Sequence, residues 1–175
     1  MLNCESISQI KSQICIVYSS VTGNTKQIAD ALATQLDLPL FAVDDRFNKN
    51  DYSIFALGFW VKRGLPDCGM QRFIEQLHNK QVFFFCTHAA WPNSEHIIKC
   101  RERVIEMLIN NQNKVIGYFN CQGRVRTTTG GTLCTKHPMT AERLVRLEEA
   151  KHHPNEFDLH NAVISFTQAL AVVRS

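Results

Sequence analysis

Residues 18–33, which read YSSVTGNTKQIADALA, decide the fold because they join an apolar run to an amphipathic one through a short polar loop. The run before the loop, Ile14–Tyr18, is rich in β-branched residues and is typical of a buried strand. After the loop, apolar residues return at Ile28, Leu32 and Leu36 with helical spacing. We therefore predict a strand over residues 14–18 and a helix over residues 25–36.

The loop between them has the composition of an anion-binding site. The first turn of a helix presents unpaired N–H groups and about half a positive charge, so a phosphate fits there. Gly23 allows a close approach of the backbone, and Ser20, Thr22, Asn24 and Thr25 offer further donors. The loop lacks the lysine of nucleotide-hydrolysing phosphate loops and is not a G-x-G-x-x-G motif. The residues alone leave two interpretations open, a phosphate site or a well-capped helix.

The rest of the chain alternates strands with helices. Further strands are predicted over residues 38–43, 52–58, 81–86 and 115–120, and helices over 70–77, 94–109, 140–152 and 154–173. The strands are almost continuously apolar, which favours a parallel sheet covered on both faces. We predict a three-layer, doubly wound α/β fold with a five-stranded parallel sheet. We expect one domain over residues 1–175, in which 124–153 form a long loop and a short helix before the last helix.

Composition limits the class of protein. The chain is 45% hydrophobic and 20% charged, as in water-soluble globular proteins, and has no apolar run that could span a bilayer. The net charge is +3 without a basic block, so no nucleic acid or membrane partner is expected. The seven cysteines include no C-x-x-C pair and predict reduced thiols. We expect a cytoplasmic protein, either a monomer or a weak dimer.

The loop SVTGNT, residues 20–25, resembles the flavodoxin phosphate loop S-x-T-G-N-T, which also follows the first strand. The phrases GFWVKRG, NCQG and LEEAKHHPNEFDLHNA look like a divergent branch of that family, and the resemblance covers residues 14–173. It implies the strand order 2-1-3-4-5 and FMN as the cofactor, bound at the point where the strand order reverses. The residues that it assigns to the phosphate are Ser20, Val21, Thr22, Gly23, Asn24 and Thr25.

The isoalloxazine ring of FMN needs aromatic walls and polar groups at its edges. The loops expected after the third and fourth strands, residues 58–64 and 87–92, each carry one of the two tryptophans, Trp60 and Trp91. The residues that we predict around the ring are Phe59, Trp60, Val61, Lys62, Thr87, His88, Ala89 and Trp91. Alternatively, either tryptophan covers apolar surface and Phe59 packs in the core. The histidines form no ligand pattern, so neither a metal site nor a catalytic side chain is predicted.

These observations favour an FMN protein that passes electrons from a reductase to an acceptor protein. An NAD(P)H-dependent FMN oxidoreductase that acts on a small substrate such as a quinone remains an alternative, as does a non-catalytic binding module. A response-regulator receiver is excluded because Gly58 and Ser19 stand where its acidic residues would be. General flavodoxin carriers are acidic, whereas this chain has a pI of about 8.5 and carries Lys62, Arg63, Arg124 and Arg126 near the expected site.

Overall fold

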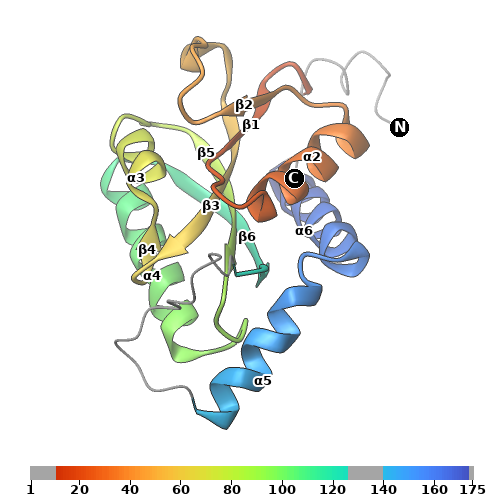
Figure 1. Cartoon of the computed structure of the whole chain (residues 1–175). Helices are drawn as coiled ribbons and strands as arrows, with labels where there is room; N and C mark the ends of the chain where they lie inside the picture. The colour runs from red at the N-terminus through yellow and green to blue at the C-terminus, as the bar shows by residue number, and fades with distance from the viewer. Residues whose placement is uncertain (1–10, 126–139, 174–175) are drawn as a thin grey trace.

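A parallel sheet forms the centre of the protein in a computed structural model that describes residues 11–125 and 140–173 (Figure 1). Its parallel strands stand in the order β2-β1-β3-β5-β6. Their bounds are Ile14–Tyr18 for β1, Leu40–Ala42 for β2, Ile54–Lys62 for β3, Gln81–His88 for β5 and Lys114–Gln122 for β6. The predicted fold class and the predicted order of five parallel strands are confirmed.

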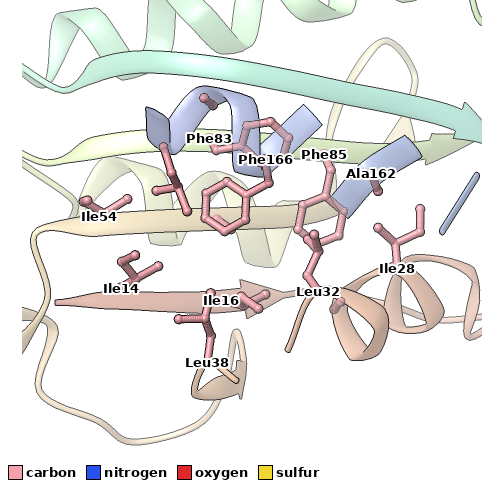
Figure 2. Packing of buried hydrophobic residues seen from close by; sticks show 14 of the residues in the cluster. Ile14, Ile16, Ile28, Leu32, Leu38, Ile54, Phe83, Phe85, Ala162 and Phe166 are labelled. Atoms are coloured by element: carbon pink, nitrogen blue, oxygen red, sulfur yellow. The ribbon is translucent and has the colours of Figure 1, made fainter. Parts of the chain in front are cut away.

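Helices cover both faces of the sheet, as Figure 1 shows. Helices α2 (Asn24–Leu36) and α6 (Glu156–Val173) lie on one face, and α3 (Cys68–Glu75) and α4 (Glu95–Asn110) on the other. Side chains of a strand alternate between the faces, so Ile14 and Ile16 join the core under α2 and α6 while Cys15 and Val17 join the other core. In the first core the Phe83 and Phe166 rings lie 4.8 Å apart between centroids (Figure 2).

Helix α5 (Ala141–Glu149) continues into the short 3-10 helix η2 (Ala150–His152), which agrees with the short helix predicted before the last one. It lies beyond the carboxyl edge of the sheet and buries none of its own residues (Figure 1). Another 3-10 turn, η1 (Lys49–Asp51), precedes β3. In residues 11–125 and 140–173, no helix combines the length and the apolar character needed to cross a membrane.

Strand β3 corrects the prediction that the third strand ends at Gly58, since it continues to Lys62. Gly58 lies inside the strand because β3 stays paired with β5 as far as Trp60, and a β-carbon at Gly58 would stand 2.3 Å from the Cζ atom of Phe85. The phenylalanine ring therefore fills the space above the glycine. Strand β5 also runs two residues further than predicted, to His88. The residues expected in loops at 59–62 and 87–88 are thus held at strand ends.

Three smaller differences separate the observed elements from the predicted ones. The chain turns back after β3 and adds a two-residue antiparallel strand, β4 (Leu65–Pro66), which is too short to give a sequence pattern. Strand β2 covers only Leu40–Ala42, whereas the prediction was a strand over residues 38–43. Helix α6 begins at Glu156 rather than at Pro154, because the Asn155 side chain accepts the N–H groups of Phe157 and Asp158 and so caps the helix.

Candidate functional site

The amino end of α2 is open toward the carboxyl edge of the sheet. Gly23 precedes the helix with φ of 89°, in the left-handed region that favours glycine. No side chain caps this helix, and a β-carbon at Gly23 would meet nothing within 4 Å. The Ser20 hydroxyl accepts the N–H of Gly23 at 3.2 Å and shapes the loop. The first turn of α2 therefore offers its N–H groups to an anion.

A cleft of about 210 Å³ lies beside this loop. Its walls come from the carboxyl ends of β1, β3, β5 and β6, where β1 and β3 form the point at which the strand order reverses. In doubly wound sheets, ligands bind at this point. The lining residues are Val21, Thr22, Asn24, Trp60, Val61, Thr87, His88, Ala89, Gly123, Arg124 and Val125. The structure thus brings the polar loop and eight of the predicted site residues together around one hollow.

Four other predicted site residues lie elsewhere. Phe59 is fully buried and packs against Phe84 in the core beneath α3 and α4, as its alternative assignment expected. Lys62 is exposed at the end of β3, with its Nζ 5.8 Å from the Trp60 ring centroid. Trp91 is 37% exposed and lines a neighbouring cleft. Thr25 is buried just behind the loop. Arg126 is outside the described residues.

Trp60 lines the first cleft and carries a hydrogen-bond donor that the described residues leave unpaired. Its indole Nε1 is buried and has no hydrogen-bond partner among the described residues. Buried indole N–H groups usually find an acceptor, because an unsatisfied buried donor costs about 1–3 kcal/mol. A ligand with a flat ring and acceptor atoms at its edge fits this wall of the cleft.

Thr25 and Thr87 tie the loop to the sheet. Their hydroxyl oxygens lie 2.8 Å apart, and both side chains are buried. The Thr25 hydroxyl, predicted as a phosphate donor, is thus already engaged with β5. What Thr25 still presents to an anion is its backbone N–H, since it stands in the first turn of α2.

Asn24 ties the same loop to the segment after β6. Its side-chain amide donates to the Arg124 carbonyl at 2.9 Å. Gly123 permits this approach, because a β-carbon there would stand 2.6 Å from the Asn24 Nδ2. The two segments on either side of the cleft are therefore held at a fixed separation.

His88 lies on the wall of the first cleft, with a hydrogen-bond partner at each ring nitrogen. Burial lowers the pKa of His88, and the hydrogen bonds with Asn120 and the Ala90 carbonyl offset this only in part. A neutral ring donates from one nitrogen only. Nδ1 lies 3.1 Å from the Ala90 carbonyl oxygen and Nε2 lies 3.0 Å from the Asn120 Oδ1, so a neutral ring can donate to one of these two oxygens. His88 therefore links the turn after β5 to β6.

A larger cleft, of about 470 Å³, shares Val61, His88 and Ala89 with the first. Trp91, Ser94 and His96 line it from the start of α4, and Glu142 and Arg146 line it from α5. Arg146 donates to the Ala89 carbonyl and so attaches α5 to the turn after β5. Ser94 occupies the N-cap position of α4, but its hydroxyl is buried without a partner among the described residues and does not cap the helix.

Sequence reasoning expected Arg124 near the site, but it did not assign Gly123 and Val125 to the lining of the first cleft, nor the α5 residues to the second. The first omission had a usable signal, since the carboxyl ends of all parallel strands meet at one edge. No sequence signal placed α5. Cys121, at the end of β6 beside the first cleft, is 3% exposed, and burial raises the pKa of its thiol well above the usual range. It is a core residue.

The fold and the open glycine loop beneath the aromatic cleft define a doubly wound protein of the flavodoxin class. The sequence model of the flavodoxin domain matches residues 15–167, so the chain belongs to the flavodoxin family. A curated relative, the flavodoxin-like domain-containing protein BilS of Clostridioides difficile (strain CD3), is 30% identical over 159 residues. The match covers 84% of this chain and 90% of BilS.

Solved structures share the fold at lower identity. Oxidised flavodoxin 2 from Bacillus cereus superposes with a TM-score of 0.55 at 17% identity, covering 91% of this chain and 97% of that one. A flavoprotein from Lactobacillus acidophilus NCFM, solved in complex with FMN, superposes with a TM-score of 0.53 at 18% identity. That match covers 62% of this chain and 93% of the flavoprotein.

Proposed function

We propose that this chain binds FMN and carries electrons between a reductase and an acceptor protein. The observation that carries the proposal is the S-x-T-G-N-T loop at an uncapped helix terminus, directly beside a cleft with an unpartnered indole N–H. The phosphate of FMN would bind the N–H groups of residues 20–25, and its ring would lie along Trp60. The flavoprotein from Lactobacillus acidophilus, which holds FMN on the same fold, supports this choice of cofactor.

When bound, FMN supplies the redox chemistry by accepting and releasing electrons one or two at a time. The residues of this chain bind and orient it. Among the described residues that line the first cleft, Arg124 and His88 are the titratable groups, and burial lowers the pKa of His88. No side chain there is placed as a general acid or base, which favours a carrier over an enzyme.

The second cleft favours one alternative, an FMN oxidoreductase that acts on a small molecule. Its volume of about 470 Å³ is within the range of small-molecule sites, and it adjoins the first cleft along Val61, His88 and Ala89. A small substrate could therefore reach the edge of a bound flavin. The alternative requires that a nicotinamide nucleotide reduce the flavin directly.

Anaerobic stopped-flow mixing tests the carrier against this enzyme. The holoprotein is mixed with NADH or NADPH alone, and then with NADPH and a catalytic amount of a flavodoxin reductase, while flavin absorbance is followed. A carrier stays oxidised for minutes with either nucleotide and bleaches when the reductase is added. Rapid bleaching by a nucleotide alone would reject the carrier in favour of the enzyme.

We also propose a cytoplasmic location. The described cysteines, Cys15, Cys68, Cys86, Cys100 and Cys121, are all free. Free thiols in this number fit a reducing compartment. A fluorescent fusion followed by cell fractionation would check the location.

Trp60→Ala is expected to weaken FMN binding by about 1–3 kcal/mol, the range found for stacking of aromatic side chains on planar bases. Trp91→Ala is the matched control, since this tryptophan lines only the second cleft and should change the affinity by less than threefold. Both affinities are obtained by titrating apoprotein and following flavin fluorescence. A larger loss from Trp91→Ala would mean that the ring lies in the second cleft.

Thr22→Val and Thr25→Val are expected to separate binding from folding. Thr22 is exposed in the loop, so its loss should weaken FMN binding and leave apoprotein stability unchanged. Thr25→Val breaks the buried bond to Thr87 and should lower the free energy of unfolding by about 1–3 kcal/mol. Urea unfolding of both apoproteins, with FMN titration, measures the two effects. Equal stability losses in the two variants would contradict this assignment.

A further inference from the structure

Two cationic side chains line the clefts and two more stand at the end of β3, the strand that carries Trp60 and Val61 of the cleft walls, and we call the four the cationic rim: Lys62, Arg63, Arg124 and Arg146. Arg124 lines the first cleft and Arg146 the second. Lys62 ends β3, with its ammonium 5.8 Å from the Trp60 ring centroid. Arg63 follows in the exposed turn between β3 and β4. The rim thus draws on three separate segments of the chain.

The charge of the rim is not neutralised within the part of the chain that the structure describes. None of its four members forms an ion pair there. Glu142 is the one carboxylate among the described residues that line the two clefts. Several carboxylates elsewhere, such as Asp30 and Glu148, are paired with lysines three or four residues away. The face around the clefts is therefore electropositive.

Exposed apolar side chains accompany the rim. Val21 is 65% exposed at the first cleft and Trp91 37% at the second. Leu144 and Val145, 53% and 62% exposed, lie on α5, the helix that also carries Arg146. Apolar contacts surrounded by charged groups are characteristic of protein–protein interfaces. A nucleic acid backbone would use the cations and leave the apolar side chains exposed to water.

We propose that this face docks an acidic surface of a redox partner protein. The proposal rests on the proposed electron-carrier function and adds the chemistry of the partner. Carboxylates of the partner would meet the cationic rim, while its apolar groups cover Val21 and Trp91. The match of opposite charges raises the rate of encounter and brings the partner's redox centre close to the edge of a flavin in the first cleft.

Two acceptors with the same haem and opposite charge test the proposal. The holoprotein with reduced FMN is mixed anaerobically with native mitochondrial cytochrome c, which is basic, or with its succinylated form, whose lysines carry carboxylates. One electron passes from the flavin to each ferric haem. At about 10 mM salt we expect at least tenfold faster reduction of the succinylated form, and at about 1 M salt a loss of most of this advantage.

A matched pair of variants assigns the effect to the rim. Arg63 has φ of 55°, which asparagine tolerates, so Arg63→Asn removes the charge without straining the turn. It should slow reduction of succinylated cytochrome c about threefold in low salt and not at all in high salt. Lys114→Gln, at the opposite edge of the sheet where β6 begins, should change neither rate. If Arg63→Asn still slows the reduction of succinylated cytochrome c in high salt, the substitution has changed the driving force of electron transfer. That result would overturn the docking role of Arg63.

Equal rates for the two cytochromes in low salt, or a faster rate for the native form, would overturn the acidic-partner proposal. The proposed function would stand in that case, because electrons would still pass to a protein. If the holoprotein holds reduced FMN and reduces neither cytochrome, both the partner proposal and the carrier function fail.

Discussion

FMN is expected to bind this protein at least a hundredfold more tightly than riboflavin, the largest effect that we predict. The two flavins differ only by the phosphate, for which the first turn of α2 has no competing side-chain cap. Hydrogen bonds to charged groups contribute about 1.5–3 kcal/mol each. Two such bonds from backbone N–H groups of residues 22–25 are sufficient for a ratio of this size.

Fluorescence titration of apoprotein with each flavin measures the ratio. Ser20→Ala should reduce it, because the Ser20 hydroxyl accepts the Gly23 N–H and shapes the loop. Ser53→Ala is the control, since Ser53 bonds to Gln13 at the other edge of the sheet and should leave the ratio unchanged. Similar dissociation constants for FMN and riboflavin in the unaltered protein would mean that the loop of residues 20–25 begins the helix but does not bind the phosphate.

Gly58→Ala is expected to lower the free energy of unfolding by about 3 kcal/mol, at the upper end of the range for overpacked cores. The new β-carbon would stand 2.3–2.4 Å from two atoms of the Phe85 ring, a separation that real contacts do not reach. The ring is fully buried, so it cannot turn out into solvent without disrupting the core. Urea unfolding of the apoprotein measures the loss.

A second substitution at Phe85 supplies the control for this prediction. Phe85→Leu removes the ring atoms that the new β-carbon would meet, at the cost of a cavity. The double variant Gly58→Ala/Phe85→Leu should therefore be more stable than the sum of the two single losses predicts. Additive losses would show that the backbone, rather than the ring, sets the requirement for glycine.

The strand order and the loop of residues 20–25 could be predicted from the sequence because both depend on local patterns. Buried parallel strands are almost continuously apolar, and the loop joins a strand to a helix within a few residues. Trp60 was placed for a related reason: it follows a predicted strand, and the carboxyl ends of these strands meet at one edge. These features do not depend on knowing which distant side chains touch.

The features that the sequence did not predict depend on such distant contacts. Gly58 suggested the end of a strand, but β3 continues because it pairs with β5 as far as Trp60 and then with β4. The hydrogen bond between the Thr25 and Thr87 hydroxyls joins residues 62 positions apart. The place of α5 beside the second cleft follows from the contact of Arg146 with the Ala89 carbonyl, which has no local signature. Side chains that meet across the sheet leave no periodic pattern.

The central claim, that the α2 terminus holds the phosphate of FMN while Trp60 borders its ring, can be measured directly by NMR on ¹⁵N-labelled apoprotein. Addition of FMN should shift the backbone amide signals of residues 22–26 and the indole N–H signal of Trp60. Riboflavin should shift the indole signal and leave the loop amides near their original positions. Loop amides that stay unmoved by saturating FMN, while signals elsewhere shift, would contradict the account.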